Sequence, residues 1–181
     1  MSNHQALFSH AHEQLLNNNY IAGFQLLGRS LFYLFKQRKA LGTTDQLNAD
    51  ARNHDIFPTL HQDPYTHRTY TKPCGYAGDA LMMDYVYESM PKTNISSIGT
   101  GVFQATTRVS MRLSVVYRKA LLNSYINDTI SHSYPFRILS IASGHCHELQ
   151  DSLVLEPTFK GKFVALDADA LSCAEIMNTY P

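Results

Sequence analysis

The sequence is poor in charge and has no net charge. Only 17% of its 181 residues are charged, below the roughly 25% of an average soluble chain. The 15 basic residues are balanced by 15 acidic ones. Without a net positive charge there is no field to hold a phosphate backbone, so we expect no nucleic-acid partner. Hydrophobic residues make up 44%, which is enough to fill a core and excludes wholesale disorder.

Long apolar runs are also lacking. The longest, Leu26–Phe35, is interrupted by glycine and polar residues and is too short to cross a bilayer. The segment Met1–Leu16 lacks the apolar run of a signal peptide. Three widely spaced cysteines form no disulfide framework and suit a reducing compartment: Cys74, Cys146 and Cys173. We therefore expect a soluble, cytoplasmic protein without a stable membrane span.

The first three quarters of the chain predict an all-helical domain, residues 1–134. Apolar residues recur there at helical spacing, and no strand pattern precedes Arg137. Three consecutive asparagines at 17–19 compete with the helical backbone and are expected to separate two helices. Prolines and glycines are dense over 55–79, which predicts single turns and loop. Helices are expected over 6–40, with that interruption, and over 80–89 and 102–126.

From residue 135 the pattern becomes α/β. Two short β-rich apolar runs, Arg137–Ala142 and Phe163–Leu166, predict buried strands. Helices are expected after each strand, over Cys146–Leu155 and Ala170–Asn178. Such a strand–helix–strand–helix unit leaves both sheet edges bare. We therefore expect residues 135–181 to be the incomplete start of a longer α/β domain, truncated at its C-terminal end.

The turn after the first strand is the most informative part of the sequence. In doubly wound folds, ligands bind outside the carboxyl ends of the strands. Gly144 lets the backbone turn sharply there, and Asp167 ends the next strand, where a carboxylate can accept hydrogen bonds from both ribose hydroxyls. A dinucleotide normally requires three glycines, and Glu148 would repel its pyrophosphate. The pattern thus favours a nucleoside cofactor without phosphate, of which S-adenosylmethionine is the commonest.

Residues 137–148 resemble the first motif of class I S-adenosylmethionine-dependent methyltransferases, and residues 163–167 resemble their second. The family's first motif starts with an acidic residue and has three alternating glycines. Those places are held here by Ser140, Ala142, Gly144 and Cys146. The resemblance implies a Rossmann-like sheet, of which this chain holds the first β-α-β-α part, and S-adenosylmethionine as cofactor. It implies cofactor contacts from Ser140, Ala142, Gly144, Asp167, Asp79 and Glu148, the last as a substitute for the missing acid.

Residues 63–85, with the string Gly75-Tyr76-Ala77-Gly78-Asp79, add to the resemblance. They are similar to a stretch that precedes the methyltransferase domain in a bacterial group associated with biosynthesis of 3-hydroxypalmitic acid methyl ester. The acceptor implied is a small-molecule or lipid-like carboxylate of the fatty-acid type. Aromatic faces attract a sulfonium, so we expect Tyr70 and Tyr76 to act in catalysis by closing over the site. The simpler alternative is that these tyrosines pack the helical domain onto the α/β domain.

Other functions stay open. Residues 145–148 (His-Cys-His-Glu) are potential zinc ligands, but adjacent residues on a turn cannot easily all point to one ion. No second ligand pair lies at metal-site spacing, so no metal site is expected. The chain could instead be a non-catalytic helical interaction module, or a fragment of an NAD-dependent oxidoreductase. A homo-oligomer is compatible with each of these functions.

Overall fold

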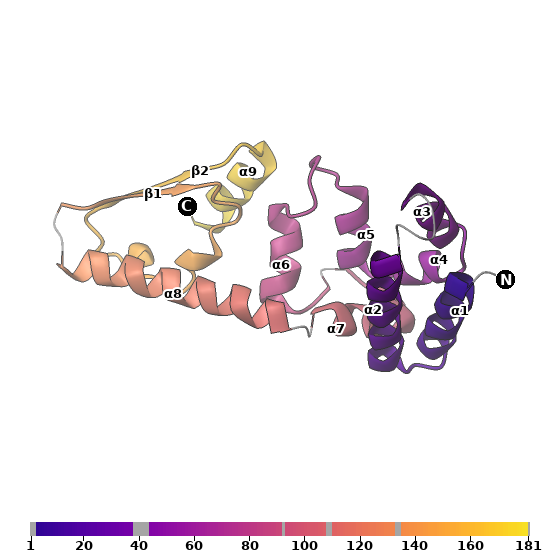
Figure 1. The fold of residues 1–181 in the computed structure, drawn as a ribbon. Coiled ribbons are helices and arrows are strands. Elements are labelled where there is room, and N and C mark those ends of the chain that lie inside the picture. Colours follow the sequence, from indigo (N-terminus) through magenta and orange to yellow (C-terminus); the bar gives the residue numbers. More distant parts are fainter. Residues whose placement is uncertain (1–2, 38–43, 92, 108–109, 133–134, 181) are drawn as a thin grey trace. The chain divides into compact units, whose positions relative to one another are not determined.

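The computed structural model describes residues 3–37, 44–91, 93–107, 110–132 and 135–180 (Figure 1). The contacts of the chain divide it into two compact units. The first unit comprises Met1–Thr71 and Ser89–Val109, and the second comprises Lys72–Glu88 and Ser110–Pro181. The boundary expected at residue 134 stays a prediction, but this grouping differs from it because α6 packs against α8, and α8 packs against the 3-10 turns that follow the first strand.

The described part of the first unit is helical, as the sequence predicts. At its N-terminus, α1 and α2 form an antiparallel pair joined at residues 17–19, where Asn18 adopts a left-handed conformation with φ of 61°. The asparagine run thus separates two helices, as expected. The elements of this unit are α1 (Asn3–Leu16), α2 (Tyr20–Gln37), α3 (Thr44–Arg52), α4 (Ile56–Leu60), α5 (Pro64–Thr71) and α7 (Ser97–Thr107).

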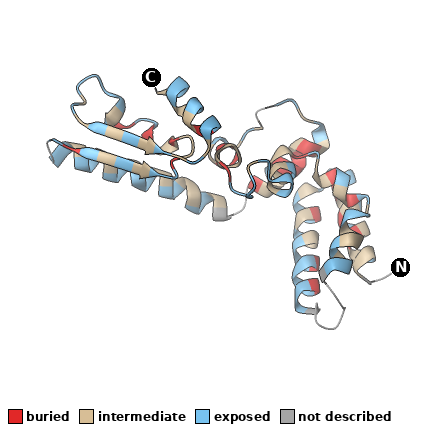
Figure 2. Ribbon diagram, turned by 90° about the horizontal axis from the view of Figure 1, so that it is seen from above, coloured by how far each residue is buried: buried red, intermediate tan, exposed pale blue. Residues whose placement is uncertain are grey.

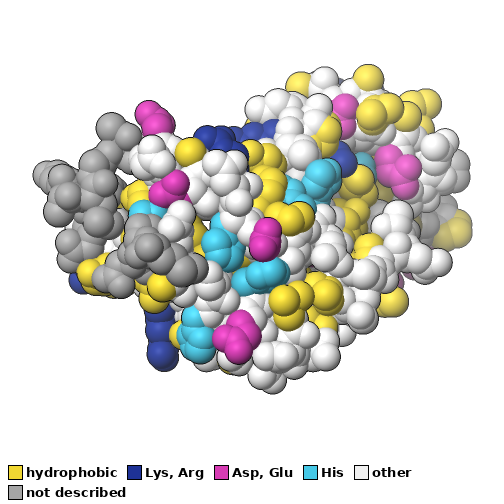
Figure 3. All heavy atoms as spheres, turned by 90° about the vertical axis from the view of Figure 1, so that its right-hand side faces the viewer, with side chains coloured by type: hydrophobic (Ala, Val, Ile, Leu, Met, Phe, Trp, Pro, Cys, Tyr) yellow, Lys and Arg dark blue, Asp and Glu magenta, His cyan; other side chains and the backbone are white. Residues whose placement is uncertain are grey.

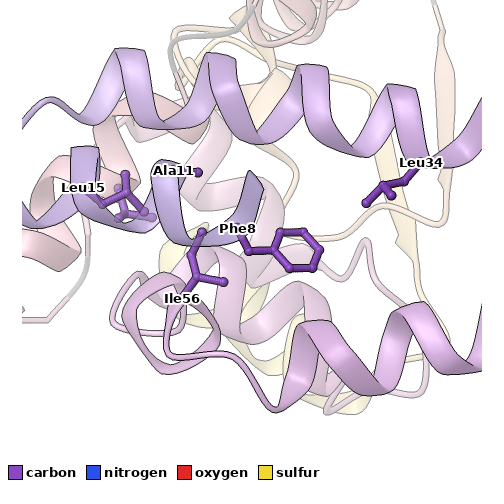
Figure 4. Packing of buried hydrophobic residues seen from close by; sticks show 6 residues of the cluster. Phe8, Ala11, Leu15, Leu34 and Ile56 are labelled. Carbon is purple, nitrogen blue, oxygen red and sulfur yellow. The ribbon is translucent and has the colours of Figure 1, made fainter. Parts of the chain in front are cut away.

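A hydrophobic cluster holds the first unit together (Figure 4). From α1 it takes Phe8, Ala11 and Leu15, which recur every three to four residues and so lie on one face of the helix. Leu34 of α2 and Ile56 of α4 complete the set labelled in the figure. Ala11 and Leu15 are fully buried. Burial of this stripe stabilises helices that are too short to persist alone.

Histidine side chains form hydrogen-bonding contacts between parts of the chain that contribute to this hydrophobic cluster. Figure 3 faces the side on which α1 lies and shows histidine side chains gathered on that side. His12 Nε2 lies 2.9 Å from the Thr59 hydroxyl, and the Ser9 hydroxyl lies 3.0 Å from Nε2 of His54. Burial, followed by the charge of the neighbouring His12, lowers the pKa of His54. These histidines link α1 to the segment around α4.

The proline-rich stretch at 55–79 contains more helix than expected. The sequence predicted single turns, whereas α5 is an eight-residue helix. The Asp63 carboxylate accepts hydrogen bonds from the backbone N–H groups of Tyr65 and Thr66, at 2.9 and 3.1 Å. Pro64 occupies the first helical position, where its missing N–H costs nothing and its φ is already helical. The prediction was wrong because this proline begins a helix instead of breaking one.

The second unit is mixed α/β. Its strands pair in parallel, with Arg137 opposite Lys162 and Ile141 opposite Leu166. Both predicted strands and the helices expected after residues 79 and 169 are confirmed. The elements are α6 (Ala80–Glu88), α8 (Ser110–His132), β1 (Arg137–Ile141), the 3-10 turns η1 (His147–Leu149) and η2 (Leu153–Leu155), β2 (Lys162–Leu166) and α9 (Ala170–Thr179).

The helix expected over Cys146–Leu155 is wrong, because two short 3-10 turns replace it. Side chains of α8 bind the backbone groups that a helix would pair internally. Asn123 Nδ2 donates to the carbonyls of Glu148 and Gln150, each at 3.0 Å. Asn127 Oδ1 accepts from the Leu153 N–H at 2.8 Å. Backbone groups satisfied in this way no longer need a continuous helix.

The single helix expected over 102–126 is two helices, α7 and α8. The strands also differ from expectation, because exposed and partly buried residues alternate along both of them (Figure 2). Side chains of one face line a cavity beneath α9, among them Phe163 and Ala165. The opposite face exposes Leu139, Ile141, Val164 and Leu166. Among the described residues, no helix is both long enough and apolar enough to cross a membrane.

Candidate functional site

A cavity of about 600 Å³ lies at the carboxyl ends of β1 and β2. Its walls come from the loop after β1, from the residues after β2, and from α6 and α8. Parallel strands end at the same sheet edge, so the two loops that follow them meet here. The predicted site residues that line it are Tyr76, Ser140, Ala142, Gly144, Glu148 and Asp167.

The loop after β1 has an unusual backbone. Three alternate residues adopt left-handed conformations: Ala142 with φ of 53°, Gly144 with 51° and Cys146 with 50°. This region is natural for glycine, but it costs other residues roughly 1–2 kcal/mol. Residues other than glycine keep this conformation only where the surrounding contacts hold the backbone in place. Such residues are frequent at binding and catalytic sites.

Asp167 joins the two strand ends. One carboxylate oxygen accepts a hydrogen bond from the Gly144 N–H at 2.7 Å, and the other accepts from the Asp169 N–H at 2.9 Å. The carboxylate therefore faces the bend at Gly144, as the sequence predicts. Each oxygen of a carboxylate has a further lone pair, so Asp167 retains the capacity to accept hydrogen bonds from a ligand.

Ser140 and Glu148 meet across the loop. The Ser140 hydroxyl donates to Glu148 Oε1 at 3.1 Å, and both residues line the cavity. The hydrogen bonds from Asn123 to residues 148 and 150 hold this segment against α8. The Glu148 carboxylate therefore lies beside Ser140, which holds the place of the acidic residue in the methyltransferase motif.

Asp84 lies behind the loop and binds two of its histidines. Its side chain is fully buried on α6. His145 Nδ1 lies 2.9 and 3.0 Å from the two carboxylate oxygens, and His147 Nε2 lies 2.6 Å from Oδ1. Sequence reasoning missed Asp84. The available signal was an acid inside the apolar run 81–86 of a predicted helix, since buried carboxylates are almost always paired.

Aromatic and basic side chains form the remaining wall. Partial desolvation and, next, the Asp167 carboxylate raise the pKa of Tyr76. Its phenol is therefore protonated at neutral pH and can donate a hydrogen bond. Lys119 Nζ lies 5.6 Å from the centre of the Tyr87 ring and donates to Gln150 Oε1 at 3.2 Å. Together with Arg118, these residues bring positive charge and aromatic rings to the cavity that the two carboxylates also line.

Cys146 is not activated as a nucleophile. It is 1% exposed, and burial, followed by the nearby Glu148, raises the pKa of its thiol to about 11. The thiolate is the reactive form of cysteine, and this thiol is protonated at neutral pH.

Two predicted site residues do not line the cavity. Tyr70 belongs to the first unit, where its ring packs edge-on against Phe57 and His61. Asp79 is buried, and its Oδ1 accepts a hydrogen bond from the Met82 N–H at 2.9 Å. Asp79 thus caps the N-terminus of α6, where an acceptor side chain satisfies otherwise unpaired N–H groups. Tyr70 therefore makes packing contacts within the first unit, and Asp79 makes the contact of a helix cap.

Comparisons of the chain with protein-family models, with curated proteins and with solved structures found no match. The function must therefore be argued from the site itself.

Proposed function

We propose that the second unit binds S-adenosylmethionine and transfers its methyl group to a small acceptor. The observation that carries this proposal is the Asp167 carboxylate bonded to the Gly144 N–H at the ends of two parallel strands. This geometry creates a polar cradle outside the carboxyl ends of the strands, where doubly wound folds bind nucleosides.

The backbone of the loop supports the proposal. The left-handed residues at 142, 144 and 146 occupy the places of the three alternating glycines in the methyltransferase motif that this loop resembles. Such glycines serve to let the backbone turn and approach a ligand closely. Ala142 and Cys146 adopt the same left-handed conformation as Gly144 at an energetic cost, which supports a loop shaped for close approach to a ligand.

The carboxylates support an adenosine cofactor without phosphate. Asp167 is placed to accept hydrogen bonds from ribose hydroxyls. Glu148, held by Ser140 at 3.1 Å, supplies a negative charge where the motif has an acidic residue, and can hold the ammonium group of the methionine end. Both carboxylates line the cavity and would repel a pyrophosphate. This charge pattern disfavours a dinucleotide.

The aromatic and basic residues of the cavity suit a sulfonium and an anionic group. The rings of Tyr76 and Tyr87 line the cavity, and an aromatic face attracts a cation by roughly 0.5–2 kcal/mol. Arg118 and Lys119 can neutralise a carboxylate, either of the cofactor or of an acceptor. S-adenosylmethionine, when bound, supplies an activated methyl group. The residues of this chain then need only align an acceptor in line with that group and exclude water.

The acceptor class rests on the resemblance of residues 63–85 to the fatty-acid methyl ester group. A carboxylate acceptor is already nucleophilic and needs no general base. The protonated Tyr76 hydroxyl can orient such a carboxylate by donating a hydrogen bond. We therefore propose a fatty-acid-type carboxylate as acceptor, to be tested by the formation of radiolabelled methyl ester from labelled cofactor and 3-hydroxy fatty acids.

Isothermal titration tests the cofactor. We expect S-adenosylmethionine and S-adenosylhomocysteine to bind the chain, and Asp167→Ala and Asp167→Asn to weaken binding about 10- to 100-fold, because hydrogen bonds to a charged group contribute roughly 1.5–3 kcal/mol. Glu175→Ala, which removes an exposed acid of α9 outside the cavity, is the matched control and should bind like the parent.

Several results would reject the proposal. These are no binding at millimolar cofactor, unchanged binding in both Asp167 variants, and stabilisation by NAD instead of S-adenosylhomocysteine. The last result would support the oxidoreductase. A cooperative thermal transition that no cofactor shifts would support the interaction module.

A further inference from the structure

Three potential metal ligands converge behind the loop after β1. They are the carboxylate of Asp84 and one ring nitrogen each of His145 and His147, and these ligand atoms all lie within 4.8 Å of one another. The two histidine nitrogens come within 2.6–3.0 Å of the carboxylate. The fold brings together groups that are 61 and 63 positions apart in the sequence.

The backbone explains how two histidines of one turn reach the same point. Adjacent residues of a turn normally point in different directions. Cys146, between them, has φ of 50° and ψ of 43°, and this left-handed residue turns its two neighbours toward α6. Neither Cys146 nor Glu148 belongs to the cluster. The sequence argument against a metal assumed that all four adjacent residues had to serve, whereas the structure uses two of them and a third group from another element.

The donor set identifies the class of ion. Two imidazoles and one carboxylate bind Zn²⁺ and related first-row ions, whereas Mg²⁺ and Ca²⁺ prefer oxygen ligands alone. Sites with three protein ligands keep a further position for water or substrate. His145 and His147 both line the 600 Å³ cavity, while the Asp84 carboxylate is fully buried.

We propose that Asp84, His145 and His147 form a binding site for a divalent transition-metal ion of the zinc class. The fourth position of the ion faces the cavity and takes water or an anionic oxygen ligand. The ion also replaces two histidine–carboxylate hydrogen bonds with coordinate bonds, so its binding stabilises the second unit. The proposal is independent of the cofactor, because it concerns only whether these side chains hold an ion.

Zinc titration of the tag-free chain, stripped with a chelator, tests the proposal. His61 and His67, whose Nδ1 atoms lie 3.1 Å apart, are a second pair of potential Zn²⁺ ligands. The titration is therefore performed in the His61→Ala/His67→Ala background, with a chromophoric chelator as competitor. We expect one Zn²⁺ per chain, a higher melting temperature with Zn²⁺, and a Co²⁺ derivative with the intense visible absorption of four-coordinate sites.

Single variants in the same background locate the ion. Asp84→Asn, His145→Ala and His147→Ala should each weaken Zn²⁺ binding about 100-fold or more, while the control His10→Ala, an exposed histidine of α1, should bind like the parent background. Asp84 is buried and its variant can fail to fold. The two histidine side chains are 16% and 18% exposed. Their variants are therefore expected to fold, and they test the proposal even if the Asp84 variant does not fold. No stoichiometric Zn²⁺ in the background protein, or unchanged affinity in both histidine variants, would overturn the proposal and leave only histidine–carboxylate hydrogen bonds.

Discussion

The two units are stabilised by different kinds of contact. In the first, apolar side chains of several helices form a single buried cluster, which includes the fully buried Leu15. In the second, the apolar face of the sheet made by Leu139, Ile141, Val164 and Leu166 is exposed. Polar contacts hold the loops of this unit: Asp167 with Gly144, Asp84 with two histidines, and Asn127 with the backbone after η1.

This difference links the apolar cluster of the first unit to stability and the polar loops of the second unit to ligand binding. The first unit also has polar contacts, such as His12 with Thr59, but its helices pack around one apolar cluster. Polar networks fix particular side chains in particular orientations, which is what a binding site requires. We therefore expect apolar truncations to affect the first unit, and substitutions of single polar atoms to affect the loops of the second.

The largest effect is expected for Leu15→Ala. The side chain is fully buried, and such truncations cost about 2–5 kcal/mol. Hydrogen exchange measured by peptide should show this loss in α1 and α2, with β1 and β2 unchanged. Leu16→Ala is the control, since Leu16 is 52% exposed and should cost less than about 0.5 kcal/mol. Equal costs at both positions, or equal loss of protection in the strands, would remove the contrast between the units.

We expect Cys146 to differ in reactivity from the other two cysteines. Cys146 is buried with a pKa raised to about 11, whereas Cys74 and Cys173 are partly exposed. At pH 8 a disulfide reagent should modify Cys146 about 100-fold more slowly than an unperturbed thiol with a pKa near 8.5. Its rate should rise with pH up to about 11, and Leu15→Ala should leave it unchanged. Fast labelling of all three thiols would show that the loop after β1 is open.

Asn127→Ala tests the polar network. The substitution removes the acceptor of the Leu153 N–H and of the Ser152 hydroxyl, so we expect a loss of about 1–2 kcal/mol. The loss should be confined to exchange of residues 147–155. Asp128→Ala, the exposed neighbour on α8, is the control and should change stability by less than about 0.5 kcal/mol. If both variants behave alike, the asparagine contacts do not order this segment.

The smallest effect concerns the pH dependence of the first unit. A hydrogen bond from His4, followed by one from Gln46, lowers the pKa of Asp50 below its ordinary 3.8. A lowered pKa contributes stability above pH 3.8 that is lost as the pH falls through the folded-state pKa. The melting temperature of the parent should therefore exceed that of Asp50→Asn at pH 6, with the gap closing as the pH falls below 3.8. Asp45→Asn, an exposed acid of α3, should show no such convergence.

Local patterns predicted part of the fold and of the site. Short apolar runs, bounded by turn-forming residues, predicted the two strands, α6 and α9. The structure confirms these four elements. Ser140, Gly144, Glu148 and Asp167 lie together because they flank strand ends, which a motif reveals. The start of α5 and the 3-10 turns after residue 146 were missed, because Asp63 caps the former and the asparagines of α8 bind the latter.

The sequence by itself determined the helical first part, the positions of the two strands and the turn at Gly144, since each depends on residues close together in the chain. Only the tertiary structure decided that Asp84 meets His145 and His147 and that Tyr70 packs on Phe57 and His61. The physical reason is the distance along the sequence over which each kind of interaction acts. Periodicity and backbone preference act over a few residues, whereas the partner of a buried polar group can come from anywhere that folding brings within hydrogen-bonding distance.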